Sequence, residues 1–191
     1  MATLMQSERE KLFIVMESLF GDIPAAVGGG VATRAYAPER KTQGADVLVA
    51  HARYDETVEK LQSLGWRHDG DLFSPNGMLG LYGSGWIKDD HKLDVLATPQ
   101  PWADEALAQE AFDQTGLRIV ALPYLVLMKL DSARGIDQGD LTRMLGLLDE
   151  IALDHVVAVV ERHYNDPHAA EDVRQYAMLG ALEYWTPERD A

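Results

Sequence analysis

The chain of 191 residues contains no cysteine. This absence excludes disulfide bridges, thiolate metal ligands and a cysteine nucleophile. The chain also lacks any apolar run that approaches the ~20 residues needed to cross a bilayer. Its N-terminal stretch, 1–11, is polar and acidic and shows no secretory signal. We therefore expect a cytoplasmic protein that does not associate with membranes.

Basic residues are scarce as well. Only 17 Lys and Arg stand against 31 Asp and Glu, which gives a net charge of −14. Proteins that bind an extended nucleic acid present a basic face to the phosphate backbone, so we expect no binding of this kind. A small anionic ligand, held by a local pocket and a divalent cation, remains compatible with this charge. Hydrophobic residues make up 47% of the chain, which is enough for a sizeable core.

The hydrophobic pattern predicts an α+β fold, with strands concentrated before residue 122 and helices after it. Strands are expected at 46–50, at two or three places within 66–86, at 92–96 and at 117–122. Helices are expected at 12–20 (after a capping box at 7–10), 54–64, 123–133, 137–151, 154–164 and 166–185. We divide the chain into an α/β core, 1–122, and a helical C-terminal region, 123–191, packed on that core.

Three consecutive glycines, Gly28, Gly29 and Gly30, form the first feature that could carry chemistry. Without a Cβ, glycine lets backbone N–H groups approach an anion closely and converge on it. A plain turn, or a close contact between a helix and a strand, would explain the same triplet.

Two carboxylates, Asp46 and Asp94, each open or interrupt a short apolar run. An ionised carboxylate in a buried strand is costly unless it is paired or binds a metal. On neighbouring strands the two could hold Mg²⁺, which prefers hard oxygen ligands. The alternative is that they lie at strand ends in water.

Charged side chains also gather around the helix that follows Pro123. Lys129 and Arg134 could neutralise phosphate if they face a cleft, whereas Lys129 could equally lie on a solvated helix face. Asp137 and Asp140 fit the cap and the third residue of the next helix without any ligand. The six histidines have no zinc-type spacing, and we expect them to be surface or satisfied residues.

Several of these segments resemble nucleotidyltransferase-fold proteins. Gly28–Ala32 and Arg40–Val49 are similar to their opening, a Gly-Gly or Gly-Ser turn, a short helix and Arg-x-Thr-x-Asp-x-Asp entering a strand. Leu93–Leu96 is similar to the strand that brings a third carboxylate. The stretch 123–141 resembles a Lys-Leu…Arg…Asp-x-x-Asp-Leu helix pair. That pair is found in bacterial members similar to abortive-infection toxins and to small aminoglycoside-modifying relatives.

The resemblance implies a mixed sheet with flanking helices, and the transfer of a nucleoside monophosphate from an NTP to an unknown acceptor with Mg²⁺. It makes Asp46 and Asp94 the catalytic and metal-binding residues. It assigns nucleotide and phosphate binding to Gly28, Gly29, Gly30, Arg40, Thr42, Lys129 and Arg134.

This sequence departs from the pattern at Gly44, which occupies the position of the first metal-binding Asp. Two functions follow as alternatives. The chain is a nucleotidyltransferase, or it is a degenerate module that senses a nucleotide or binds a partner. The C-terminal helices, 152–185, either form a dimer or partner face or simply cover the sheet.

Overall fold

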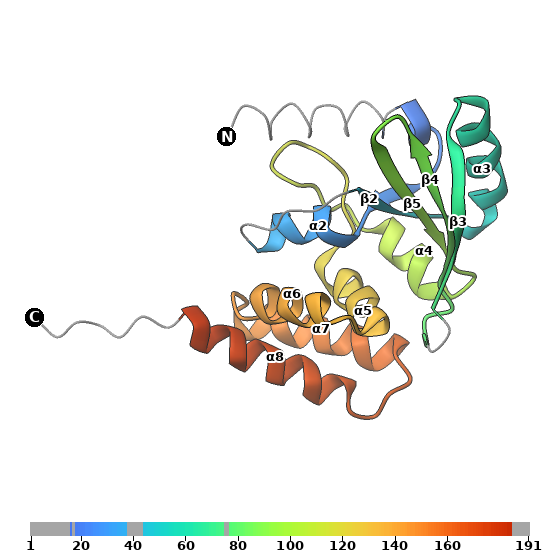
Figure 1. The fold of residues 1–191 in the computed structure, drawn as a ribbon. Helices are drawn as coiled ribbons and strands as arrows, with labels where there is room; N and C mark the ends of the chain where they lie inside the picture. Colours follow the sequence, from blue (N-terminus) through green and yellow to red (C-terminus); the bar gives the residue numbers. More distant parts are fainter. Residues whose placement is uncertain (1–15, 17, 38–43, 75–76, 185–191) are drawn as a thin grey trace, which may run out of the picture.

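The computed structural model describes residues 16, 18–37, 44–74 and 77–184. Its centre is a mixed five-stranded sheet with the order β1-β2-β5-β4-β3. The strands are β1 (Ala25–Val27), β2 (Ala45–Val49), β3 (Arg67–Phe73), β4 (Tyr82–Lys88) and β5 (His91–Ala97). In Figure 1 this sheet occupies the upper part of the molecule, with a group of helices stacked below it. The predicted α+β class with a mixed sheet and flanking helices is confirmed.

The central pair of strands is parallel, whereas the other pairs are antiparallel. β2 and β5 run side by side in the register Ala45 with Leu93 and Asp46 with Asp94. β1 pairs with the far side of β2, and the hairpin of β3 and β4 extends the sheet beyond β5. The apolar residues at alternate positions of β2 and β5 are buried, as expected for strands with one face packed on the core.

Helices cover the two faces of the sheet differently. α3 (Tyr54–Ser63) lies against one face, where the Tyr54 and Ser84 hydroxyls are hydrogen-bonded at 2.8 Å. Ser84 pairs with Val95, whose side chain points away from the face that carries Asp94. α2 (Gly29–Tyr36) packs against β2 and also contacts α5 (Leu122–Ser132).

The helical region is formed by α5, α6 (Gly135–Leu145), α7 (Glu150–His163) and α8 (Ala169–Tyr184). α5 packs on α6 and α7, and α8 packs on α6 and α7 (Figure 1). α6 and α8 approach closely at Gly146 and Gly180, because a Cβ on Gly180 would come within 2.0 Å of the Thr142 carbonyl oxygen. α4 (Pro101–Ala108) joins this region to the sheet, since it contacts both β2 and α5.

Several predicted boundaries were wrong. The break expected between helices 137–151 and 154–164 lies earlier in the chain, because α6 ends at Leu145 and α7 begins after Asp149, whose carboxylate accepts from the Ala152 N–H. The strand expected over 117–122 forms only isolated bridges, at 118 and 119. α4 was not predicted, although Pro101 stands at its first turn, where proline is favoured. The capping box at 7–10 and most of the helix at 12–20 lie outside the described residues.

Candidate functional site

Asp46 and Asp94 lie next to each other on one face of the sheet. They are register partners on the parallel strands β2 and β5, so their side chains leave the sheet on the same side. Both are half-buried, while the flanking strand residues on the opposite face are buried. The sheet therefore brings the two predicted carboxylates together.

The turn between β1 and α2 lies over the face of the sheet that carries the Asp46 side chain. The Gly28 N–H donates to the Asp46 carbonyl oxygen at 2.7 Å. Gly29 has a φ of +54°, and a Cβ there would lie 1.6 Å from Asp46 Oδ2. Only glycine can take this backbone conformation at this distance from the carboxylate. Two of the three predicted glycines thus contact the site directly, whereas Gly30 is buried within α2.

The pKa of Asp94 is raised above its ordinary value. Burial is the main cause, and the neighbouring negative charge of Asp46 adds to it. Lys92 and Arg134 act in the opposite direction and favour the ionised form. A cation placed between the two carboxylates would relieve this repulsion, since opposite charges within a few ångströms favour the ionised state.

Asp69 is a third acidic residue of this face, and the sequence analysis did not include it. A Cβ on Gly85 would lie 3.3 Å from Asp94 Oδ1 and 3.8 Å from Asp69 Cβ, so both acids border the same glycine. The register of β3 and β4 shifts between His68 and Gly70, which leaves Asp69 outside the regular pairing. Because Arg67 pairs with Ile87, alternation along β3 already places Asp69 on the face of Gly85 and Asp94.

Arg134 reaches the same neighbourhood from the helical region. It is the N-cap residue of α6, and its Nε donates to Asp137 Oδ2 at 2.6 Å. This hydrogen bond raises the pKa of Arg134, and the charge of Asp46 contributes in the same direction. Arg134 therefore lies within electrostatic reach of both strand carboxylates.

Lys129 is buried, with 3% of its side chain exposed, so the solvated helix face weighed from the sequence was wrong. Its ammonium donates to Asp137 Oδ1 at 2.9 Å and to Asp140 Oδ2 at 2.7 Å. The capping prediction for Asp137 and Asp140 was also wrong, because α6 begins at Gly135 and both carboxylates bind Lys129 instead.

The remaining residues of the predicted pattern are Arg40, Thr42 and Gly44. Arg40 and Thr42 lie outside the described residues. Gly44 is exposed and has a φ of +110°, so this position combines the absence of a side chain with a backbone conformation that other residues rarely adopt.

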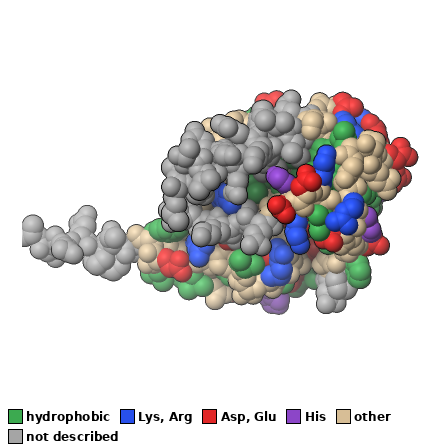
Figure 2. All heavy atoms as spheres, turned by 45° about the horizontal axis from the view of Figure 1, so that its top comes forward, with side chains coloured by type: hydrophobic (Ala, Val, Ile, Leu, Met, Phe, Trp, Pro, Cys, Tyr) green, Lys and Arg blue, Asp and Glu red, His purple; other side chains and the backbone are tan. Residues whose placement is uncertain are grey.

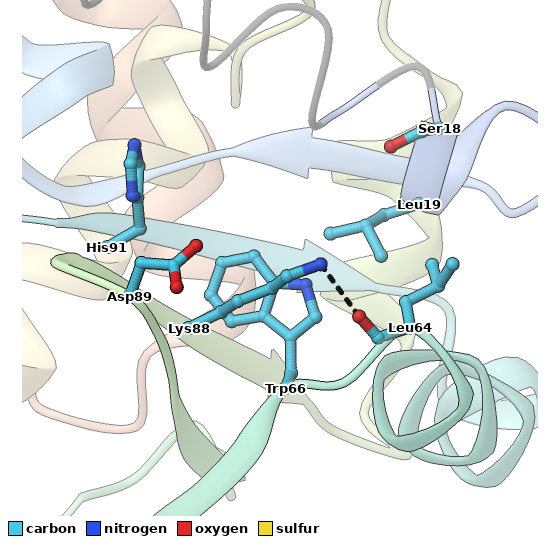
Figure 3. A pocket seen from close by; sticks show the side chains of 7 residues that line it. All are labelled: Ser18, Leu19, Leu64, Trp66, Lys88, Asp89 and His91. Carbon is cyan, nitrogen blue, oxygen red and sulfur yellow. Dashed lines mark hydrogen bonds between the residues drawn. The ribbon is translucent and has the colours of Figure 1, made fainter.

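A small cavity of about 210 Å³ lies on the other face of the sheet. Figure 3 shows its lining: Ser18, Leu19, Leu64, Trp66, Lys88, Asp89 and His91. Lys88 Nζ donates to the Leu64 carbonyl oxygen across it at 2.7 Å. Because side chains alternate along β5, His91 points to the face opposite Asp94, and this cavity is separate from the carboxylate pair.

Basic side chains are scattered among acidic and uncharged ones on the face in Figure 2, and the described residues there form no continuous basic band. His163 is a satisfied histidine, since its Nε2 is 2.9 Å from Glu105 Oε2. None of the described helices is long and apolar enough to cross a membrane.

The residues fit one Mg²⁺ but not a complete three-carboxylate site. Among the described residues, no three His, Cys, Asp or Glu side chains are grouped so that they could hold a metal ion. Asp69 therefore influences Asp94 electrostatically without completing a metal site. Mg²⁺ is commonly bound by one or two carboxylates together with substrate phosphates and water, and the chemistry of the Asp46 and Asp94 pair fits that mode.

Comparison with known proteins finds two solved structures of low similarity. No protein family and no curated protein matches the sequence. The solution structure of the antibiotic-resistance factor ANT(2'')-Ia is 18% identical with a TM-score of 0.48, over 96% of this chain and 95% of that one. A crystal structure of ANT(2'')-Ia in complex with adenylyl-2''-tobramycin is 17% identical with a TM-score of 0.46, over 92% of this chain and 99% of that one. At these TM-scores the two likenesses carry no argument on the fold family of this chain or on what it binds or transfers.

Proposed function

We propose that this chain binds a nucleoside triphosphate beside Asp46 and Asp94 and transfers its nucleoside monophosphate to an acceptor hydroxyl. The observation that carries the proposal is the pairing of these two carboxylates on parallel strands, directly under the Gly28–Gly29 turn. A glycine turn at a helix N-terminus offers backbone N–H groups and a positive dipole end to a phosphate. Two adjacent carboxylates suit the cation that accompanies such a phosphate.

Each part of the site has a distinct role in this proposal. Gly28 and Gly29 approach the phosphates, and Arg134 neutralises their charge. Asp46 and Asp94 would hold Mg²⁺, which supplies charge neutralisation and alignment of the reacting oxygens. Asp94, beside Asp46 on the neighbouring strand, would also accept the proton of the acceptor hydroxyl. The acceptor oxygen bonds to the α-phosphorus, its proton passes to Asp94, and the bond to pyrophosphate breaks.

The experiment is a thermal-shift titration with each of ATP, GTP, CTP and UTP, with and without Mg²⁺. A ligand that binds only the folded state raises the midpoint, so a shift that requires both NTP and Mg²⁺ supports the proposal. Asp46→Asn and Asp94→Asn should each abolish the Mg²⁺-dependent part. Asp55→Asn is the matched control, because Asp55 is an exposed acid on α3, which covers the opposite face. An unchanged shift in both site variants would refute the assignment.

Gly44 favours a second candidate, a module that binds a nucleotide or a protein without catalysis. With no carboxylate at this position, one metal ligand of the resembled family is missing. The candidate predicts nucleotide binding that ignores Mg²⁺, or none, in the same titration. Placing Asp at position 44 is a poor test of it, because a φ of +110° strains any residue with a Cβ. A partner surface would fit the exposed apolar side chains of α8, which include Met178 and Leu182.

A further inference from the structure

The conformation of Arg134 depends on a single buried carboxylate. The guanidinium is largely exposed, at 66% of its side-chain area, yet its Nε is bound to Asp137 Oδ2 at 2.6 Å. Its two terminal nitrogens have no hydrogen-bond partner among the described residues. An arginine held only through Nε keeps the two ends of its fork available for an anion.

Asp137 itself is fixed from several sides. Its side chain is 1% exposed, and besides Arg134 it accepts from Ser132 Oγ at 2.6 Å and from Lys129 Nζ at 2.9 Å. Lys129 is held in turn by Asp140 at 2.7 Å. Side chains locked by packing and by surrounding hydrogen bonds hold a functional group within narrow limits.

The held guanidinium lies near the carboxylate pair. The negative charge of Asp46 raises the pKa of Arg134, and the positive charge of Arg134 opposes the rise in the pKa of Asp94. α6 also contacts α2, the helix whose first residue packs on Asp46. The guanidinium of Arg134, at the start of α6, and the glycine turn, at the start of α2, thus border the same part of the sheet.

We propose that Asp137 is a positioning residue that holds Arg134 by Nε, so that the terminal nitrogens of Arg134 meet the phosphates of a nucleotide bound beside Asp46 and Asp94. The nature of this ligand rests on the proposed function. Lys129 then serves the site indirectly, because it neutralises and fixes Asp137 and has no exposed surface with which to meet a phosphate.

The test is a double-mutant cycle on nucleotide affinity, measured by calorimetry with ATP, GTP, CTP and UTP in the presence of Mg²⁺. Arg134→Ala should weaken binding by about tenfold, the size expected for one charge-assisted contact. Asp137→Asn should weaken it by a smaller factor in the wild-type background and by none in the Arg134→Ala background. Equal losses in both backgrounds would show that Asp137 acts by stability alone and would overturn the inference.

Asp140→Asn is the matched control. It removes a carboxylate from the same buried Lys129, with no hydrogen bond to Arg134. Asp140→Asn should therefore lower the unfolding midpoint as Asp137→Asn does, while weakening nucleotide affinity less, because Asp140 acts on Arg134 only through Lys129 and through its charge. A loss of affinity equal to that of Asp137→Asn would contradict a role specific to Asp137.

A ligand-free measurement separates this inference from the proposed function. In ¹⁵N-labelled protein, the Nε–H of Arg134 should exchange slowly in the wild type and rapidly in Asp137→Asn. Slow exchange together with no binding of any NTP would refute the proposed function and the nucleotide part of this inference, while the positioning by Asp137 would stand. Rapid exchange in the wild type would overturn the positioning itself.

Discussion

The substitution Gly29→Ala tests the glycine turn most directly. The new Cβ would lie 1.6 Å from Asp46 Oδ2, whereas real Cβ atoms essentially never come within 3.0 Å of another atom, so the carboxylate must retreat by at least about 1.4 Å. A left-handed conformation costs an L-residue ~1–2 kcal/mol, and crowding of a packed position costs ~1–3 kcal/mol. We therefore expect a loss of ~2–5 kcal/mol in the free energy of unfolding.

Two measurements on the Gly29→Ala variant check this reasoning. With an m-value of ~2 kcal/mol/M, the midpoint of urea unfolding should fall by ~1–2.5 M. The Mg²⁺-dependent thermal shift with NTP should also be lost, since a misplacement of ~1 Å can cost a hundredfold in function.

Gly139→Ala is the matched control for the same chemical change. Gly139 lies inside α6 with no atom within 4 Å of its Cβ position. Alanine is favoured there by ~0.5–1 kcal/mol, so the midpoint should rise slightly. If Gly29→Ala matched wild type in both stability and nucleotide response, the close packing of the turn on Asp46 would be refuted.

Three further predictions concern the packing of the helical region. Lys129→Ala removes the cation shared by two buried carboxylates, of which Asp137 keeps Arg134 and Ser132, and should cost ~3–5 kcal/mol in urea unfolding; a cost below ~1 kcal/mol would mean that the buried ion pairs do not form. Gly180→Ala should destabilise by ~1–3 kcal/mol or more, because its Cβ meets backbone of α6; wild-type stability would show that α6 and α8 do not cross so closely. The hydrogen bond from His163 lowers the pKa of Glu105 below 4.5, so its stabilisation is present above that pH and is lost as pH falls through the folded-state value. Glu105→Gln should therefore lower the melting temperature at pH 7 and flatten its decline below pH 4.5, whereas parallel curves would count against this contact.

Local sequence was sufficient for the elements that surround the site. The apolar runs around Asp46 and Asp94 predicted β2 and β5 nearly to the residue, because a buried strand needs little more than a short β-branched stretch between turn signals. The helices α3 and α5 were predicted within about one residue for the same kind of reason, an apolar stripe bounded by glycine or proline. The break between α6 and α7 was predicted too late in the chain, since Gly146 ends α6 within a pattern that stays periodic.

The sequence by itself determined which residue types were available: a glycine triplet, two strand carboxylates, and a lysine and an arginine beside a pair of acids. Tertiary structure alone decided their partners. Asp46 lies beside Asp94 because β2 and β5 pair in parallel and in that register, and Asp69 borders this face because β3 pairs with β4, the neighbour of β5. Lys129 is buried on two carboxylates while Arg134 stays exposed beside the site. Both are cations near the same helix end, and which of them meets water depends on how α6 packs against α5, a contact between segments that no local pattern encodes.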